Sequence, residues 1–249
     1  MSNYYQNNTV FNVNGYEIYF TRYSDSILQG HFNDIILELN SILNSFYINK
    51  QQIISPGGGL STITQNLGNS LRDKNWIKEN IESEHHVHGK IMSSESHEVD
   101  HYRSHKKGNI GLEIEWNNKD PFFDRDLENF RKLHQIGELS LGIIITRGAS
   151  LQTELLGVYK SFVEKISPFN YETIVSTLSP ISDAMKNKIK TALSFDFTEC
   201  VSKIARELYS SKYGTATTHM DKLILRLDRG VGNPCPFVLI GIGKERLIP

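Results

Sequence analysis

The feature that most constrains the fold is the run LSLGIIIT at 139–146, which contains no charged residue. Continuous apolar runs of this length are typical of strands that are buried on both faces, and such strands occur mainly in parallel sheets. A second strand is predicted at 109–116 (NIGLEIEW), and Asp120 with Pro121 marks the start of a helix between the two strands. Strand, helix and strand in this order indicate a βαβ unit with parallel strands and a right-handed crossover.

Further elements extend this unit in both directions along the chain. NGYEIYF at 14–20 predicts a short strand after an Asn-Gly turn, and the apolar spacing across 24–46 predicts a helix that packs on the core. Residues 151–166 predict another helix, 168–212 a mixed helical region, and 236–243 (PFVLIGIG) a further buried strand. We therefore expect an α/β fold with a mixed central β-sheet that is flanked by helices.

The composition is that of an ordinary globular protein. The 249 residues are enough to bury a sizeable core, and 39% hydrophobic with 22% charged residues is typical of soluble proteins. The N-terminus lacks a secretory pattern and no apolar stretch is long enough for a membrane span, so we expect a cytoplasmic protein without a membrane partner. Cys200 and Cys235, the two cysteines, support neither a disulfide framework nor a Cys-rich zinc module.

The domain organisation and the charge set further limits. There is no internal repeat and no obvious linker, so we expect one domain over 1–249, with 1–50 adding a strand and a helix to a core of about 50–245. The net charge of −1 argues against a protein that coats nucleic acid non-specifically. It does not exclude a DNA enzyme, because positive charge can be local and a metal can supply part of it.

Three consecutive glycines at 57–59 precede a helix whose N-cap is expected at Ser61 or Thr62. Bare backbone amides can hold a phosphate, but the P-loop requires Lys followed by Ser or Thr after its last glycine. Leu60 and Ser61 stand there, so nucleotide binding is not predicted. A flexible turn next to DNA, or a mobile connection, is the favoured interpretation.

Two glutamates alternate with apolar residues in the strand at 109–116. Because successive side chains of a strand point to opposite faces, Glu113 and Glu115 share one face. Their charges repel, and a buried charge is costly unless it is paired or binds a metal. One interpretation is a solvent-facing strand with Lys or Arg partners. The other is a Mg²⁺ site, because Mg²⁺ takes carboxylate oxygens and cancels their repulsion.

A third carboxylate strengthens the metal interpretation. Asp100 lies in a strand-like segment, HEVDHY at 97–102, and turn residues separate it from Glu113. The two acids could lie on adjacent strands with converging carboxylates, and the backbone carbonyl of Ile114 could also reach the ion. Metal-dependent nucleases use such a pair, followed by a polar residue two positions on, to hold a cation against the phosphate. Asp124 and Asp126 are competing acids.

Histidines are frequent between 85 and 105 and raise the alternative of a zinc site. The cysteine partners of structural zinc sites and the HExxH pattern of catalytic ones are both missing. We therefore favour a different role for His101 or His105, beside Asp100, as a DNA-phosphate contact or as a support for the acid pair.

The segment DHYRSHKKGNIGLEIEW at 100–116 resembles the PD-(D/E)xK nuclease signature, with Glu115 in the place of the usual lysine. With GLEIEWNNKDPFFDRDLENFRKL, LSLGIIITRG, TTHMDKLILRLDRG and CPFVLIGIG, the chain resembles type II restriction endonucleases of the BamHI/BglII/BstYI group over roughly 50–245. The resemblance implies a restriction-endonuclease-like core and Mg²⁺-dependent cleavage of double-stranded DNA. It further implies a short palindromic site, 5′-phosphate ends, a homodimer and a cognate DNA methyltransferase that acts on the same site.

The resemblance also implies roles for individual residues. Asp100 and Glu113 match the metal-binding pair, and Glu115 matches a Glu or Gln that orients or deprotonates the attacking water. Because Glu115 replaces lysine, a positive charge that would stabilise the transition state is lost. Asn118 matches an asparagine that enters the major groove, where Asn can pair with adenine or guanine edges. Further candidates for DNA contact are Asn117, Lys119, Arg125, Thr218, His219, Asp221 and Lys222.

Several alternatives stay open at this point. Asn117 and Asn118 could form a plain turn before a helix, and Arg147 could contact a phosphate or form a surface salt bridge. A structure-specific or repair nuclease of the same fold, or a non-catalytic DNA-binding module, are the competing functions. The converging carboxylates argue against the last, because they are costly without a cation. Relatives commonly read sites with a GATC core, although a few loop residues can redirect that readout.

Overall fold

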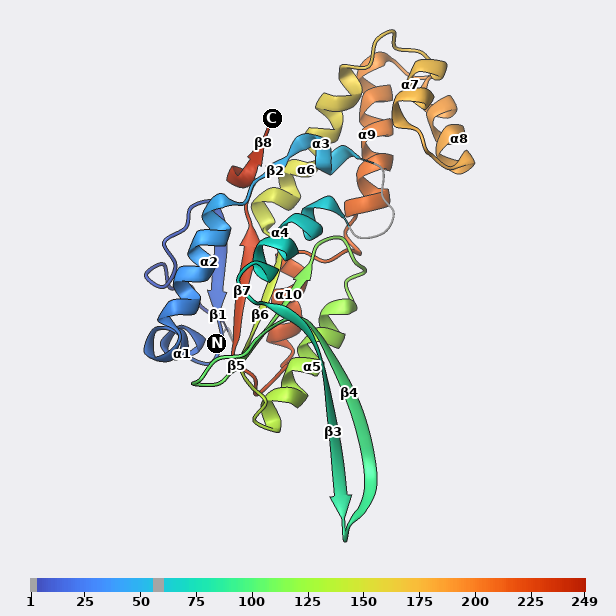
Figure 1. Cartoon of the computed structure of the whole chain (residues 1–249). Helices are drawn as coiled ribbons and strands as arrows, with labels where there is room; N and C mark the ends of the chain where they lie inside the picture. Colours follow the sequence, from blue (N-terminus) through green and yellow to red (C-terminus); the bar gives the residue numbers. More distant parts are fainter. Residues whose placement is uncertain (1–3, 56–60) are drawn as a thin grey trace.

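The computed structural model describes residues 4–55 and 61–249, so the triple-glycine segment lies outside the described residues. A six-stranded mixed sheet with the order β1-β7-β6-β5-β4-β3 runs through the molecule (Figure 1). Its strands are β1 (Tyr16–Phe20), β3 (Ile77–Val87), β4 (Lys90–Arg103), β5 (Asn109–Glu115), β6 (Leu139–Arg147) and β7 (Phe237–Ile242). A small second sheet pairs β2 (Ile48–Asn49) with β8 (Leu247–Ile248).

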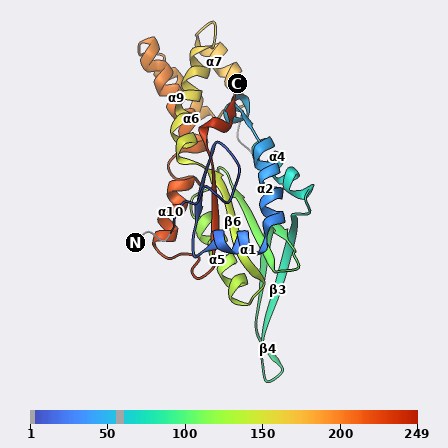
Figure 2. The ribbon, with the colours of Figure 1, turned by 90° about the vertical axis from the view of Figure 1, so that its left-hand side faces the viewer.

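Helices cover both faces of the central sheet, with α1, α2 and α4 on one side and α5 and α10 on the other (Figure 2). The α/β fold with a mixed sheet flanked by helices is therefore confirmed. The helices are α1 (Ser24–His31), α2 (Asn33–Ser45), α3 (Lys50–Ile54), α4 (Thr62–Arg72), α5 (Phe122–Gln135), α6 (Ala149–Glu164), α7 (Tyr171–Leu178), α8 (Asp183–Ala192), α9 (Phe197–Tyr213) and α10 (Met220–Asp228), with a 3₁₀ turn at Lys244–Arg246.

The βαβ unit that the sequence predicts forms the centre of the sheet. β5 and β6 are parallel, with Leu112 opposite Ile143 and Ile114 opposite Ile145, and α5 makes the crossover between them. β7 continues the parallel part beside β6. β1 pairs antiparallel with β7, and β4 pairs antiparallel with β5, which makes the sheet mixed.

The alternation along β5 divides its side chains between two cores. Leu112, Ile114 and Trp116 belong to the larger apolar cluster, which includes side chains of α1, α2, α4 and α6. The intervening residues face α5, because a Cβ at Gly111 would lie 2.7 Å from Phe130 Cε1. Glu113 and Glu115 share this second face, so the apolar face of β5 fixes where the two carboxylates point.

Two local expectations differ from the structure, and a third, the N-cap of α4, is confirmed. The predicted helix at 24–46 is two helices, because Phe32 adopts a non-helical φ of −131° and buries its side chain. Asp120 does not cap α5, which follows Pro121 without a side-chain cap. Its carboxylate instead lies 3.4 Å from Arg226 Nη2, a partner from α10 that the local sequence does not reveal. Ser61 is the N-cap of α4 and accepts a hydrogen bond from Thr64 N.

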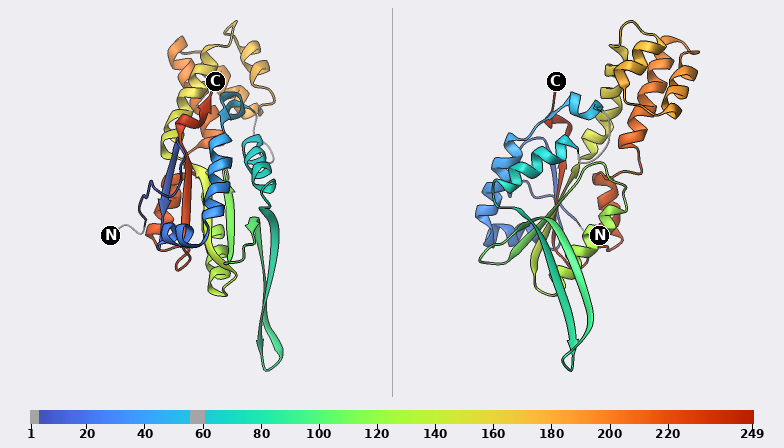
Figure 3. Two further views of the ribbon diagram at one scale, coloured as in Figure 1. Left: turned by 60° about the vertical axis from the view of Figure 1, so that its left-hand side comes forward. Right: turned by 45° about the vertical axis from the view of Figure 1, so that its right-hand side comes forward.

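Two parts of the molecule project from opposite ends of the sheet (Figures 1 and 3). The β3–β4 hairpin extends well beyond the point where β4 pairs with β5, and α7, α8 and α9 form a helical lobe at the other end. The sequence predicts only short pieces of this hairpin, such as HEVDHY at 97–102. Most side chains of β3 and of the first part of β4 are exposed, so no apolar alternation marks these strands.

The packing of α5 on the sheet should be sensitive to added volume at Gly142. A Cβ there would lie 2.5 Å from Phe130 Cδ2 and 2.8 Å from Phe237 Cε1. We expect Gly142→Ala to lower the free energy of unfolding by about 1–3 kcal/mol, because an overpacked core must shift. Urea denaturation followed by circular dichroism measures this loss.

Gly30→Ala is the matched control, because no atom lies within 4 Å of a Cβ at this position of α1. It should leave stability unchanged or raise it by up to about 1 kcal/mol, because Ala favours helices over Gly. Equal effects of the two substitutions would contradict the packing described for Gly142.

Candidate active site

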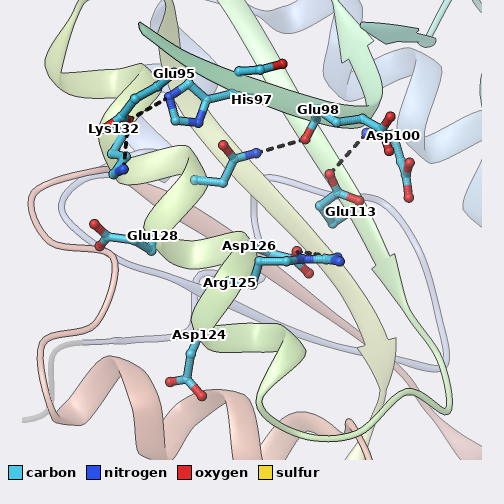
Figure 4. Close-up of a pocket in the computed structure, with 12 residues that line it drawn as sticks. Glu95, His97, Glu98, Asp100, Glu113, Asp124, Arg125, Asp126, Glu128 and Lys132 are labelled. Atoms are coloured by element: carbon cyan, nitrogen blue, oxygen red, sulfur yellow. Dashed lines mark hydrogen bonds and ion pairs between the residues drawn. The ribbon is translucent and has the colours of Figure 1, made fainter. Parts of the chain in front are cut away.

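An acidic cleft of about 680 Å³ lies beside β4, β5 and α5 (Figure 4). Arg125 and Lys132 are the only Lys or Arg side chains among its lining residues in the described chain, against seven carboxylates. Such a surface repels the phosphates of DNA unless cations enter with them. The carboxylates belong to Glu95, Glu98, Asp100, Glu113, Asp124, Asp126 and Glu128.

The structure places Asp100 and Glu113 on adjacent strands, as the turn residues between them predict. The antiparallel ladder pairs His101 with Leu112, which places Asp100 opposite Glu113 on the adjacent strand. Asp100 N donates a hydrogen bond to Glu113 Oε1 over 3.1 Å. Glu113 is buried, whereas the side chain of Asp100 is 53% exposed and faces solvent at the edge of the cleft.

Glu115 lies one pleat further along the same face and is also buried, at 3% exposure. Asn118 Nδ2 donates to Glu115 Oε2 over 2.8 Å, and Arg125 Nη2 lies 3.8 Å from Glu115 Oε1. Two side chains that were expected to contact DNA are therefore the polar neighbours of this carboxylate. Both Asn118 and Arg125 remain exposed on their outer side.

Asp126, one of the two acids expected to compete with Asp100, is a buried carboxylate of this site. Its Oδ1 accepts a hydrogen bond from Arg125 Nε and forms an ion pair with Arg125 Nη2, whereas its Oδ2 is buried without a hydrogen-bond partner within the described residues. The spacing of apolar residues in α5 already predicts that Asp126 is buried. Phe123, Leu127 and Phe130 mark the buried stripe of α5, and Asp126 falls on that stripe.

Burial and mutual repulsion shift the pKa values of these acids. Burial, followed by the charge of Asp126, raises the pKa of Glu113 well above its ordinary value. The same two causes raise the pKa of Glu115 to about 9, although the Asn118 amide and the Arg125 charge oppose the shift. Burial also raises the pKa of Asp126. Glu113 and Asp126, which line the cleft, and Glu115 beside it are therefore carboxyl groups whose ionised forms need additional positive charge.

The donor atoms fit a hard divalent cation such as Mg²⁺. Asp100 and Glu113 offer carboxylate oxygens, and Ile114, whose side chain is buried on the opposite face, offers only its carbonyl. Mg²⁺ usually binds one or two carboxylates and keeps several waters. Within 4–55 and 61–249, no three His, Cys, Asp or Glu side chains are grouped closely enough to hold an ion by themselves.

The two segments expected to read DNA lie against each other beside the cleft. Asn118 O accepts a hydrogen bond from Thr218 N over 2.9 Å, and Asp120 N donates to Ala216 O over 3.0 Å. Lys119 forms an antiparallel bridge with Thr217 between these contacts. Two stretches that are about a hundred residues apart therefore form one short ribbon, with Asn118 and Lys119 exposed on it.

In the second of these segments, two of the side chains that were expected to contact DNA are buried. Thr218 is fully buried and His219 is 7% exposed, so neither side chain lies on the surface that a groove could reach. Asp221 and Lys222 belong to α10 and not to a loop. Lys222 Nζ lies 3.6 Å from Asp120 Oδ2, whereas the side chain of Asp221 is exposed.

Arg147 forms no surface salt bridge, and that expectation was wrong. Its side chain is fully buried and makes no ion pair with any carboxylate in the described part of the chain. The guanidinium donates from Nε and Nη2 to Thr218 O and lies 4.8 Å from the ring centroid of Tyr213. Burial lowers the pKa of Arg147 to about 10. Arg147 therefore supports the 217–218 segment from beneath.

His101 and His105, the histidines considered as partners of Asp100, lie outside the acidic cleft. His101 is buried against α4, where a Cβ at Gly68 would lie 3.1 Å from its Nε2. His105 Nε2 lies 3.2 Å from Asp34 Oδ2. Neither residue lines the acidic cleft, so a direct phosphate contact there is not supported for either of them. His97 does line the cleft and contacts Glu95 over 3.3 Å.

The fold and the site together define a class of protein. A mixed α/β sheet that presents opposed acids on adjacent strands, with a third carboxylate two residues on, resembles the arrangement in many metal-dependent nucleases. The family model for restriction endonuclease BglII/BglIII matches residues 16–242, and the chain belongs to this family. It is therefore a site-specific deoxyribonuclease that acts on phosphodiester bonds. A comparison with curated proteins gave no match.

Among the described residues, no helix combines the length and the apolar character that crossing a membrane requires.

The buried carboxylates should reduce stability when no cation is present. We expect Glu115→Gln to raise the free energy of unfolding at neutral pH by about 1 kcal/mol or more, because each pKa unit is worth about 1.4 kcal/mol. The raised pKa means that wild-type stability is lost as pH rises from the unfolded value of 4.5 to about 9. The gain from Glu115→Gln should therefore grow across that window.

Thermal midpoints in EDTA at a series of pH values measure this effect. Glu154→Gln, which removes an exposed carboxylate from α6, should change the midpoint little at any pH. A midpoint for Glu115→Gln that stays at or below the wild-type value across the series would contradict the repulsion described here.

Proposed function

We propose that this protein is a type II restriction endonuclease that cleaves double-stranded DNA at a short palindromic site. In this proposal the reaction requires Mg²⁺ and leaves 5′-phosphate ends. The observation that carries it is the placement of Asp100 opposite Glu113, with Glu115 on the same face, in a cleft that is too acidic to accept DNA alone.

Asp100, Glu113 and the carbonyl of Ile114 would hold the metal ion. When bound, Mg²⁺ would polarise the scissile phosphate, favour ionisation of a water molecule and neutralise charge on the leaving oxygen. The two acids come from adjacent strands of one sheet, so their backbones are held rigidly. Catalytic groups on such elements are positioned more accurately than groups on loops.

Glu115 would orient the attacking water and accept its proton. Asn118 holds one oxygen of this carboxylate by a hydrogen bond over 2.8 Å, which leaves the other oxygen near Arg125. A carboxylate with a raised pKa is a stronger proton acceptor once it has lost its own proton. In-line attack on phosphorus and departure of the 3′-oxygen give a 5′-phosphate and a 3′-hydroxyl.

Base recognition would use the ribbon formed by 117–119 and 216–218. Asn117, Asn118 and Lys119 are its accessible members, and Asp221 and Lys222 extend the surface along α10. Asn118 can act in both processes, because its Nδ2 carries a second hydrogen and its Oδ1 remains an acceptor while one hydrogen is donated to Glu115. Thr218 and His219, which are buried, would position this ribbon without touching DNA.

A homodimer and a partner methyltransferase complete the proposal. One chain provides one Asp100–Glu113 pair, whereas a double-strand break requires two reactions. A twofold dimer on a palindrome places one such pair at each scissile phosphate, because the symmetry of the protein matches that of the site. A cell that contains this activity needs its own copies of the site modified, which is the role of a methyltransferase with the same recognition sequence.

Digestion of unmethylated genomic DNA in Mg²⁺, followed by sequencing of the ends, tests this function. We expect discrete fragments with 5′-phosphates at one palindromic sequence. Glu113→Ala should lower the single-turnover cleavage rate by about 10³-fold or more, because it removes a cation ligand. DNA binding in Ca²⁺ should change little.

Glu154→Ala, at an exposed position of α6 that does not line the cleft, serves as the control and should cut at the wild-type rate. Cleavage that depends on DNA ends, flaps or mismatches would instead identify a structure-specific nuclease. Sequence-specific binding that is unchanged by Glu113→Ala, with no cleavage under any metal condition, would identify a binding module.

Asn118→Ala should affect both recognition and chemistry. The substitution removes the hydrogen bond to Glu115, so we expect a cleavage rate at the cognate site that is at least about tenfold lower, the range of a lost hydrogen bond to a charged group. It should also relax discrimination against single base-pair changes in the site. Cleavage rates on the cognate site and on its single variants separate the two effects, and an unchanged rate would exclude the link to Glu115.

A further inference from the structure

The position of Glu115 leaves the catalytic strand without a positive charge. In the PD-(D/E)xK signature that the chain resembles, a lysine occupies this place, whereas the only charged side chains on this face of β5 are the acids Glu113 and Glu115. Among the Lys and Arg side chains that line the cleft, Lys132 Nζ lies 2.7 Å from Glu95, beside His97 at the end away from Asp126 (Figure 4). Arg125 is the lining cation beside Glu115.

The guanidinium of Arg125 is held in one orientation. Its Nε donates a hydrogen bond to Asp126 Oδ1 over 2.9 Å, and its Nη2 forms an ion pair with the same oxygen at 2.8 Å. Asp126 is itself anchored in the buried face of α5. The group lies over the ring of Phe122, with Cζ 4.6 Å from the ring centroid. Contacts on two sides therefore fix the plane of a group that is usually mobile.

The same side chain remains open to the cleft. Arg125 is 63% exposed at its side chain, in contrast to 3% for Glu115 and 4% for Asp126. Its Nη1 makes no hydrogen bond to any of the described residues, so it can donate to an incoming oxygen. A structural role as the counter-ion of Asp126 uses Nε and Nη2 only and leaves Nη1 unexplained.

We infer that Arg125 supplies from α5 the positive charge that β5 lacks, by contacting a non-bridging oxygen of the scissile phosphate. This inference rests on the proposed function, because it takes the Asp100–Glu113 cleft as the place of phosphodiester cleavage. The guanidinium fork matches phosphate oxygens, and a preorganised donor stabilises the charge that grows on them in the transition state. Arg125 is then a catalytic residue, and Asp126 and Phe122 are its positioning residues.

Arg125→Gln and Arg125→Lys test this role, with single-turnover cleavage and DNA affinity in Ca²⁺ measured separately. Arg125→Gln can still donate to Asp126 but carries no charge, so we expect its cleavage rate to fall about 10²- to 10³-fold. Its DNA dissociation constant should change less than about fivefold, the scale of one exposed ionic contact. Arg125→Lys keeps the charge without the fork and should be intermediate.

Two further measurements separate catalysis from structure. Arg125→Ala should regain part of its cleavage rate when millimolar guanidinium is added, whereas a variant that is merely misfolded would not. Arg131→Ala removes an equal charge from the same helix, where it pairs with Glu128, and should cut at the wild-type rate. Thermal midpoints of all four variants show whether each is folded.

Wild-type cleavage together with an unchanged rate for Arg125→Gln would overturn the inference. It would also be overturned if the dissociation constant rose in proportion to the loss of rate, because Arg125 would then be a binding contact only. Absence of cleavage by the wild-type protein on any unmethylated DNA would instead remove the proposed function itself. If Arg125→Ala fails to fold, Arg125→Gln and Arg125→Lys decide the question.

Discussion

The parallel pairing of β5 with β6 is the constraint on which the remaining structure depends. It buries Leu112, Ile114 and Trp116 in the larger core, and this burial leaves the intervening glutamates no orientation except toward α5. A shift of β5 by one residue would exchange the two faces and place carboxylates in that core, at a cost of several kcal/mol per charge. The register that makes the fold stable therefore also creates the acidic cleft.

Much of this arrangement could be predicted from local sequence patterns. The apolar run at 139–146 and the alternation at 109–116 suffice for the βαβ unit, and the turn residues before Glu113 place Asp100 on the adjacent strand. What could not be predicted depends on partners that are distant in the chain. Asp120 pairs with Arg226 and Arg147 supports Thr218, so neither has the local role that its neighbours in sequence suggested.

The buried carboxyl groups of this site lower the stability of the fold when they are ionised, and two of them, Glu113 and Glu115, are the proposed cation ligand and proton acceptor. Burial and mutual repulsion oppose ionisation of Glu113, Glu115 and Asp126. The apolar packing of α5 on the sheet contributes stability that offsets this cost. A bound cation would relieve the repulsion, because a nearby positive charge favours the ionised form of a carboxyl group. Sites with such internal conflict are expected where function outweighs local stability.

The hydrogen bond between Asn118 and Glu115 has a consequence for fidelity. A base pair that displaces Asn118 from its place on the ribbon would also withdraw its amide from Glu115, the carboxylate proposed to orient the attacking water. Errors in the DNA sequence would then slow the reaction after binding has occurred. Discrimination between cognate and near-cognate DNA would appear mainly in the turnover step, and a bound but uncut complex would form at the wrong sites.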